Sequence, residues 1–378
     1  MSTSSIQIPR HGALLLLTWF VLLVFGTIMV GSSSVAMAGD YVTRQLVNLC
    51  VSMFLLVIVA VTPLSFWRKY YGLGWLASLI LVVLVFIPGL GHEVNGATRW
   101  IRLPGFNLQA VEVAKFGLMI YLAGYLARYH DDLERSPIRI FIPLAMVFGI
   151  CALVVAEPDL GSAAVILATT LSVLFVAGAK LRYVLFMVVG GGAAFALMVW
   201  LEPFRMRRMA AFTDPWAVPF DTGYQLVQAL IAFGRGEVFG LGLGEGIQKL
   251  SYLPEAHNDF IFAVIAEEFG SIGAIACIAL YSFFIFAILA VAKQRLMLGD
   301  RFASYCCYFV GFIFAYQFMV NVGVNVGVLP TKGLTLPFIS YGGSSFIALS
   351  IGMGLLLSLT RRNPYAARVS MTRNWNRK

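Results

Sequence analysis

Long apolar runs separated by short polar segments fill most of the chain. Ten of these runs, some of them extending into their flanks, approach the ~17–25 residues that a bilayer-spanning helix needs. They cover residues 12–30, 46–66, 75–90, 110–127, 140–156, 162–179, 183–200, 271–292, 304–321 and 346–360. The first run is long enough to span and leads into a second, so we interpret it as a helix and not as a signal peptide. The pattern predicts an all-α polytopic membrane protein with ten transmembrane helices.

The connections between these runs are short, with one exception. The loop at about 201–258, between the seventh and eighth predicted helices, is the longest, and a loop of this length is expected to be functional. Its glycine-spaced run 240–246 resembles a phosphate cradle, but no strand and helix flank it as a nucleotide site requires, which favours tight turns. We expect one membrane domain over 1–378, with a core of about 12–360 and a basic tail at 361–378.

Composition and charge agree with a membrane protein and set its orientation. The chain is 60% hydrophobic and 12% charged, against about a quarter charged in soluble domains. With a cytoplasmic N-terminus, the inner side holds 17 basic and 4 acidic residues, a net +13; the rest holds 10 basic and 14 acidic, a net −4. This excess of Lys and Arg inside predicts that both termini are cytoplasmic. The basic balance therefore reflects topology and attraction to anionic lipid, and not nucleic-acid binding.

Five outer segments are too polar for their apolar surroundings, and charge near a membrane is costly and usually functional. They are 95–102, 111–115, 157–161, 254–259 and 329–345. The prolines and glycines of the last segment argue against a continuous helix. Irregular backbone at membrane depth is tolerated only where it is buried in protein or lines a wet cavity, so we expect Lys332 to face a cavity. We interpret Trp100, Tyr252 and Phe338 as interface anchors.

Each charged residue also has a purely structural interpretation. Arg99 and Arg102 could sit among lipid headgroups. Glu112 and Lys115, three residues apart on one helical face, suit an ion pair. Several carboxylates could act in turns or as helix caps: Glu157, Asp159 and Asp259. No second carboxylate of the helix after Asp259 shares its face, because Glu267 and Glu268 lie roughly 80° and 180° around the axis.

Together these segments resemble the SEDS family (shape, elongation, division and sporulation), ten-span bacterial proteins that polymerise peptidoglycan glycan from lipid II. The resemblance covers about residues 12–360. The most specific matches are NGATRWI at 95–101, EPDLGSA at 157–163, GYQLVQAL at 223–230, KLSYLPEAHNDFIFAVIAEEFG at 249–270 and PTKGLTLPFISYGGSS at 330–345. The 331–333 motif and the run before Asp259 are similar to the cell-division branch, the FtsW type, and less so to the RodA type of elongation. Asn258 and Ala229 depart from the residues expected there.

The resemblance implies that Asp259 is the catalytic aspartate. A single carboxylate suits general-base activation of a sugar hydroxyl in an inverting displacement, and the pyrophosphate leaving group needs fixed positive charge. The candidates for that charge are Lys332, Arg99 and Arg102, and the other substrate-binding candidates are Lys115, Glu157, Asp159, His257 and Ser344. No ligand set for Mg²⁺ or Mn²⁺ is recognisable, so a divalent cation stays open. A helix N-terminus should favour the ionised form of Asp259 and weaken it as a base.

Two other functions fit a ten-helix protein: a lipid II flippase and a non-catalytic division scaffold. A flippase needs charges along a route through both leaflets, whereas the unusual charges here gather on the outer side. The resemblance further implies a class B penicillin-binding protein transpeptidase as partner, with other membrane proteins of the division machinery. It also implies a multi-pass location in the bacterial inner membrane, at the division septum.

Overall fold

The computed structural model describes residues 10–35, 41–94, 97–103, 106–331 and 333–360. Helices form most of it, with a single small sheet in the described ranges. The helices are α1 Arg10–Ser33, α2 Tyr41–Val61, α3 Leu64–Lys69, α4 Tyr71–Leu84, α5 Ala110–Tyr129, η1 His130–Asp132, α6 Ile138–Ala156, α7 Leu160–Val176, α8 Leu181–Trp200, α9 Pro203–Thr213, η2 Pro215–Ala217, α10 Tyr224–Gly236, α11 Ile261–Met297, α12 Arg301–Asn325 and α13 Gly343–Thr360. The strands are β1 Gly91–Val94, β2 Ala97–Leu103 and β3 Phe106–Gln109.

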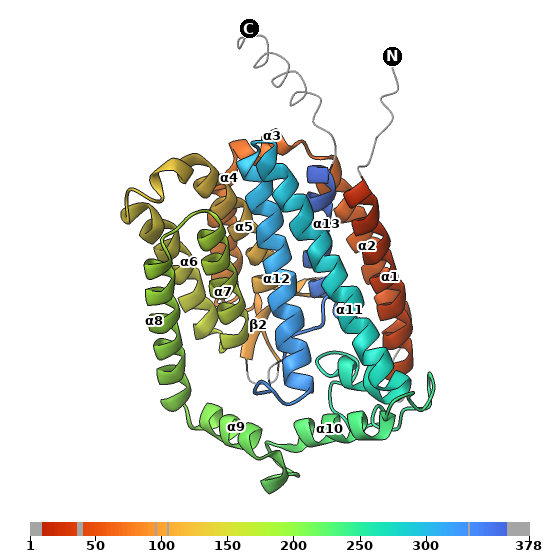
Figure 1. Ribbon diagram of the computed structural model, residues 1–378. Helices are drawn as coiled ribbons and strands as arrows, with labels where there is room; N and C mark the ends of the chain where they lie inside the picture. Colours follow the sequence, from red (N-terminus) through yellow and green to blue (C-terminus); the bar gives the residue numbers. More distant parts are fainter. Residues whose placement is uncertain (1–9, 36–40, 95–96, 104–105, 332, 361–378) are drawn as a thin grey trace.

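The long helices form a bundle, with α1 beginning and α13 ending at its upper end in Figure 1. The short helices α9 and α10 lie across the opposite end. Among the described residues, eight helices are long and apolar enough to cross a membrane, and α4 and α7 are shorter apolar helices. Each of the ten predicted runs overlaps one of these ten helices, which confirms the all-α membrane fold. The number of crossings stays a prediction, because α4 and α7 are shorter than a typical span.

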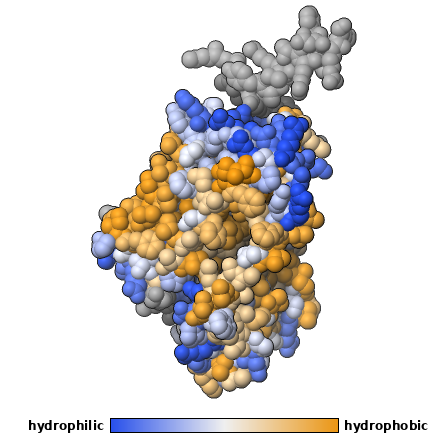
Figure 2. All heavy atoms as spheres, turned by 90° about the vertical axis from the view of Figure 1, so that its left-hand side faces the viewer, coloured by the Kyte–Doolittle hydropathy of each residue, from blue (hydrophilic) through white to orange (hydrophobic). Residues whose placement is uncertain are grey.

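The surface of the bundle is banded by hydropathy. On the face drawn in Figure 2, hydrophobic residues dominate the middle, and hydrophilic residues gather toward the ends, most clearly at the upper one. Helix α8 contributes large exposed apolar side chains, among them Phe186 and Val189 at 70% and 71% exposure. Such an apolar belt is what a lipid-facing surface requires, since lipid tails solvate these groups and water does not.

A three-stranded antiparallel sheet, which the apolar pattern did not predict, connects α4 to α5. Trp100 of β2 pairs with His92 of β1 and with Gln109 of β3. A β-bulge interrupts the alternation of β2: His92 pairs with Trp100 and Glu93 with Thr98, which leaves Arg99 as the extra, unpaired residue of the strand. Arg102 lies in the regular part of β2, opposite Asn107 of β3. The bulge therefore gives Arg99 a backbone position unlike that of Arg102.

Helix α11 changes direction at Gly270, whose φ of 67° and ψ of −170° are non-helical. The loop at about 201–258, called the outer loop from here on, provides backbone donors for the carbonyl groups that this break leaves unpaired. The N–H groups of Leu241 and Gly242 donate to the carbonyls of Glu267 and Glu268, both at 3.0 Å. A buried backbone polar group without a partner is costly, so the loop and the break in α11 stabilise each other.

The segment between α12 and α13 contains no helix in its described residues, as its prolines and glycines predicted. Its backbone is buried in protein: a Cβ on Gly26 of α1 would clash with the carbonyl of Phe338. Phe338 itself is fully buried, with its ring edge-on to Trp19, Phe284 and Phe314. The interpretation of Phe338 as an interface anchor is therefore wrong; Tyr252, by contrast, is 53% exposed.

Candidate functional site

Asp259 lies in the turn immediately before α11 and is partly buried. The N-cap of α11 is Phe260, and no side chain makes a capping hydrogen bond there. Within the described part of the chain, the Asp259 carboxylate accepts no hydrogen bond at all. It lies against Gly333, where a Cβ would come within 2.8 Å of its Oδ2 atom, so only glycine allows this approach. The carboxylate is thus held near the 329–345 segment and is not used as a helix cap.

The surroundings of Asp259 raise its pKa to about 7. Burial is the largest cause, because it penalises the charged form, and the negative charge of Glu255 adds to it. The positive charge of Arg99 acts in the opposite direction. Burial and the neighbouring carboxylate therefore act against the helix dipole, which was expected to make Asp259 a weaker base.

Arg99 bridges the sheet to the connection between α6 and α7. Its Nε donates to the carbonyl oxygen of Glu157 at 3.0 Å and its Nη2 to that of Pro158 at 2.6 Å. A guanidinium at the C-terminal end of a helix such as α6 also complements the helix dipole. The charge of Arg99 lowers the pKa values of Asp259, Glu157 and Arg208, so these groups share one electrostatic environment.

Glu157 and Asp159 play different parts in the α6–α7 connection. Asp159 is the N-cap of α7: its Oδ1 accepts from the Ser162 N–H at 3.1 Å and its Oδ2 from the Ser162 hydroxyl at 2.7 Å. The predicted cap is thus confirmed. Glu157 is 1% exposed, and neither of its carboxyl oxygens has a hydrogen-bond partner among the described residues. Burial and Asp159 raise the pKa of Glu157 to about 8 although Arg99 opposes them, so the group is largely protonated at neutral pH.

The predicted ion pair on α5 is confirmed. Lys115 Nζ lies 2.7 Å from Glu112 Oε1, and both residues are buried. Ser344, the second residue of α13, accepts a hydrogen bond from the Gln109 N–H at 3.0 Å and donates one to the Asn107 carbonyl at 2.6 Å. It thereby fixes β3 to α13. The roles of Lys115 and Ser344 in substrate binding stay predictions.

His257 lies in a cluster of three rings. Its ring centroid is 5.1 Å from that of Tyr41 on α2 and 5.5 Å from that of Tyr341. Burial lowers the pKa of His257, against the opposing charge of Glu255, so the imidazole is neutral at pH 7. The His257 carbonyl accepts from the Tyr341 N–H at 2.9 Å, which joins the Asp259 turn to the 329–345 segment. The structure thus gives His257 packing contacts, and a substrate role stays a prediction.

The remaining predicted cations are Arg102 and Lys332. Arg102 is exposed and lies opposite Asn107 of β3. Lys332 lies outside the described residues, so its cavity-facing position and its role stay predictions.

Three residues near the site were not singled out from sequence: Glu255, Arg208 and Arg44. Glu255 raises the pKa of Asp259, and Arg99, after burial, lowers the pKa of Arg208. Burial raises the pKa of Tyr341, and Arg44 of α2 opposes that rise. Arg208 follows Arg205 and Arg207 in the outer loop, a basic cluster that could have drawn attention to it.

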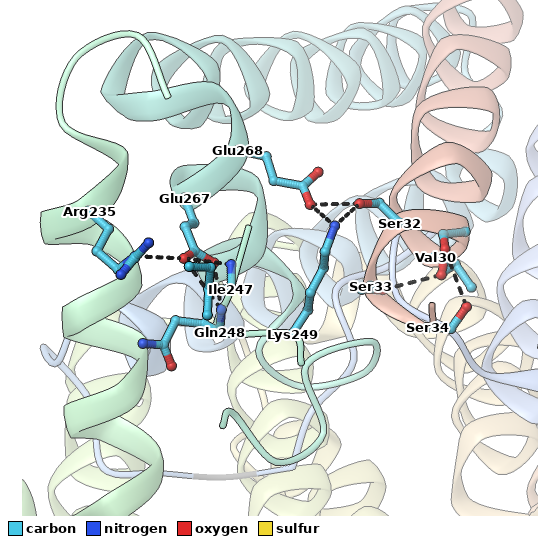
Figure 3. Close-up of polar contacts among 11 residues, drawn as sticks. Val30, Ser32, Ser33, Ser34, Arg235, Ile247, Gln248, Lys249, Glu267 and Glu268 are labelled. Carbon is cyan, nitrogen blue, oxygen red and sulfur yellow. Dashed lines mark hydrogen bonds and ion pairs between the residues drawn. The ribbon is translucent and has the colours of Figure 1, made fainter. Parts of the chain in front are cut away.

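The outer loop is fastened to α11 by two buried carboxylates (Figure 3). Glu268 accepts from Lys249 Nζ at 2.6 Å and from the Ser32 hydroxyl of α1 at 2.6 Å. Glu267 accepts from Arg235 Nε at 3.2 Å and from the backbone N–H groups of the loop at residues 247–248. Glu267 and Glu268 do not form a carboxylate pair with Asp259, which agrees with the angles predicted for them around the helix axis. They instead hold the segment that leads into the Asp259 turn.

No group of three or more His, Cys, Asp or Glu side chains in the described ranges is placed to hold a metal ion. The described site offers a carboxylate of raised pKa, a carboxyl group that is largely protonated at neutral pH, and arginine guanidinium groups nearby. Such a set suits proton abstraction next to a substrate with negative charge.

Known proteins resemble this chain over nearly its whole length. The model of the FtsW/RodA/SpoVE family of cell cycle proteins matches residues 12–365. A probable peptidoglycan glycosyltransferase FtsW of Saccharophagus degradans is 45% identical over 350 residues, which cover 91% of this chain and 90% of the relative. The protein of the same description from Nitrosococcus halophilus is 44% identical over 373 residues, covering 96% of each chain.

Solved structures show the same fold. A chain from a study of a peptidoglycan synthase complex that coordinates polymerization and crosslinking matches with a TM-score of 0.75 at 28% identity, covering 92% of this chain and 96% of that one. The rod shape determining protein RodA of Thermus thermophilus matches with a TM-score of 0.68 at 27% identity, covering 92% and 95%. The match to the family model over residues 12–365, supported by these relatives, shows that the chain belongs to the FtsW/RodA/SpoVE family of cell cycle proteins.

Proposed function

We propose that this chain, a peptidoglycan glycosyltransferase of the FtsW type, polymerises lipid II into glycan strands at the outer face of the inner membrane during cell division. Its relatives are named as peptidoglycan glycosyltransferases. The observation that carries the proposal is the state of Asp259: a partly buried carboxyl group with no capping role and a pKa of about 7. A general base works best when its pKa is near the operating pH.

In the proposed reaction Asp259 accepts the proton of a sugar hydroxyl of one lipid-linked disaccharide. The hydroxyl oxygen forms a bond to the anomeric carbon of a second lipid-linked chain. The bond from that carbon to its pyrophosphate oxygen breaks, and the electron pair leaves with the pyrophosphate. A single displacement of this kind inverts the configuration at the anomeric carbon.

Fixed positive charge is required for the leaving pyrophosphate, which gains negative charge as the bond breaks. Among the described residues, Arg99 is the candidate cation whose charge acts on Asp259. We propose Lys332, next to Gly333 in sequence, as the second cation for the pyrophosphate. Glu157, largely protonated at neutral pH, adds no negative charge that would repel the phosphates. Arg102 is exposed, so we assign it to headgroups at the membrane surface.

The proposed partner is a class B penicillin-binding protein that crosslinks the new strands. The likeness to a chain of a peptidoglycan synthase complex, whose study couples polymerization to crosslinking, supports this partner class. Assembly with other division proteins, at the septum of the inner membrane, completes the proposal; the apolar belt of the bundle supports a membrane location.

Asp259→Asn tests the proposal with purified chain in detergent, lipid II as substrate, and the transpeptidase present or absent. Asparagine preserves size and cannot accept the proton, and a positioned base contributes about 10²–10⁴-fold. Glycan polymer should therefore fall to near background. The thermal melting curve should be preserved, because the carboxylate makes no hydrogen bond to the described residues that asparagine would lose.

The competing function is lipid II transport. If the Asp259→Asn protein polymerised lipid II at the parental rate, the general-base role would be refuted. Loss of lipid II movement across vesicles by the same protein, with no polymerisation by the parental chain, would make the flippase the better assignment.

A further inference from the structure

A polar stripe runs along one face of α12 near its end. Gln317, Asn321 and Asn325 follow one another at four-residue spacing, so they lie on the same side of the helix. Each is at most 1% exposed. Buried amides inside an apolar helix are costly unless they are hydrogen-bonded, so each needs an account of its partners.

The Asn325 carboxamide occupies the place of a peptide bond in the first turn of α11. In a regular helix the Ala263 N–H would donate to the carbonyl of Asp259, four residues earlier. Here the Ala263 N–H donates to Asn325 Oδ1 at 3.0 Å and also reaches the Phe260 carbonyl at 3.1 Å. Asn325 Nδ2 donates to the Asp259 carbonyl at 2.9 Å. Asn325 thus satisfies both groups while Asp259 stays outside the helix.

Asn321 joins this turn to the segment on the opposite side of Asp259. Its Nδ2 donates to the Asp259 carbonyl at 2.9 Å and to the Leu334 carbonyl at 2.7 Å. Leu334 follows Gly333, the residue that lies against the Asp259 carboxylate. One carboxamide on a rigid helix therefore ties together the two irregular segments that meet at the proposed catalytic group.

We propose that Asn321 and Asn325 are positioning residues of the glycosyltransferase: they hold the Asp259 backbone on α12 and fix its carboxylate against the Gly333 segment. This inference rests on the proposed role of Asp259. The physical reason is that both segments are irregular and have few backbone bonds of their own. Without the two amides, the turn would keep its bonds to Ser340 and Tyr341, but the Asp259 carbonyl would lose both of its side-chain donors. Asp259 itself could then rewind into α11 or shift away from residue 333.

Gln317 supplies a matched control. It lies one turn before Asn321 on the same face, equally buried, and its Oε1 has no hydrogen-bond partner among the described residues. Gln317→Leu and Asn325→Leu therefore both replace a buried amide by leucine on α12. Only the second removes bonds to the Asp259 turn.

The test measures lipid II polymerisation and amide hydrogen exchange on the purified full-length chain in detergent. Asn325→Leu and Asn321→Leu should each lower kcat about 10–100-fold with little change in KM, since small misplacement of a catalytic group costs about this much. Gln317→Leu should keep parental kcat. Exchange in the peptide 254–264 should rise in Asn325→Leu and stay parental in Gln317→Leu.

A pH profile separates positioning from mere stabilisation. The charged and titratable groups facing Asp259 are Glu255 on its own turn and Arg99 on β2, with His257 two residues away. If the turn loosens, the carboxyl group gains water, so the acid limb of the kcat profile should move to lower pH in Asn325→Leu. Parental kcat together with parental exchange would overturn the proposal. Absence of polymerisation by the parental chain would remove the proposed function, while the exchange data would still decide whether the amides hold the turn.

Discussion

At the residue scale, two carboxyl groups of the outer site differ in accessibility, and this difference suits them to different tasks. Asp259 is partly exposed and has a pKa of about 7, so it exchanges its proton near neutral pH. Glu157 is almost fully buried, lacks hydrogen-bond partners among the described residues, and has a pKa of about 8. The difference in exposure therefore suits Asp259 to exchange a proton with a substrate and leaves Glu157 as a buried neutral group.

The charge of Glu255 should contribute to the pH dependence of turnover. Because burial, and after it Glu255, raise the pKa of Asp259 to about 7, the base form gains population as pH rises through about 7, and kcat/KM should rise over the same range. Glu255→Gln removes a negative charge, so the acid limb should move to lower pH. Initial rates of lipid II polymerisation from pH 5.5 to 9 measure this shift.

Glu245→Gln is the control, since it makes the same charge change on an exposed residue of the outer loop. The acid limb of the pH profile of the Glu245→Gln protein should coincide with that of the parental protein. A Glu255→Gln profile that also coincides with the parental one would show that another group controls the limb.

Sequence predicted some of these residue roles and not others. Local spacing was sufficient for the Lys115–Glu112 pair and the Asp159 cap, because both partners lie within one turn. The raised pKa of Asp259 was missed because burial depends on segments distant in sequence, Gly333 among them. The contacts of Asn321 and Asn325 were missed for the same reason, although two asparagines in an apolar span were a visible signal.

At the element scale, the outer loop and α11 act as one unit. The loop backbone closes the break at Gly270, and the buried charges of Glu267 and Glu268 attach residues 235–249 to the first part of α11. That first part starts directly after Asp259. The position of the catalytic turn therefore depends on loop contacts more than ten residues away along the chain.

Breaking the buried Lys249–Glu268 pair should destabilise this unit. Both side chains are at most 2% exposed, so Glu268→Gln leaves the Lys249 charge buried without its counter-ion, at a cost of about 3–5 kcal/mol. Lys249→Met combined with Glu268→Gln removes both charges and should recover much of the loss. Thermal melting of the purified variants in detergent measures the effect. Arg235→Gln is the comparison: Arg235 is 40% exposed, and Glu267 keeps two backbone donors, so its loss should be smaller.

The elements themselves were predicted where apolar runs are long. The run 183–200 corresponds to α8 at Leu181–Trp200, and the run that begins at 271 starts directly after the break in α11. The apolar run was placed only from 271 because two glutamates interrupt the hydrophobicity of the first part of α11, although a helix carrying Glu267 and Glu268 was expected after Asp259. The sheet was missed because strands this short, interrupted by charged residues, have no distinctive alternation.

At the scale of the whole molecule, ion pairs fasten both ends of the bundle. At one end Arg68 meets Asp300 at 2.6 Å, and Arg301 meets Asp131 at 3.1 Å, which ties α3 and η1 to the start of α12. The other end carries the outer loop with its buried pairs. The apolar middle of the bundle has few charges. The ion pairs therefore lie at the two ends, where a charged group costs less free energy than it would at membrane depth.

The charge division between the two ends predicts that α9 and α10 lie outside the cell membrane. A cysteine at Asp221, exposed in the turn before α10, should react with a membrane-impermeant maleimide added to intact spheroplasts. A cysteine at Asp132, exposed in η1, should react only after the membrane is opened. A Cys50→Ser background removes the one native cysteine that is exposed on the bundle surface. Because Lys and Arg resist translocation, the basic end should stay inside. Labelling of the Asp132 site, and not the Asp221 site, from outside would reverse the orientation and place Asp259 on the cytoplasmic side, where the proposed reaction could not build an external wall.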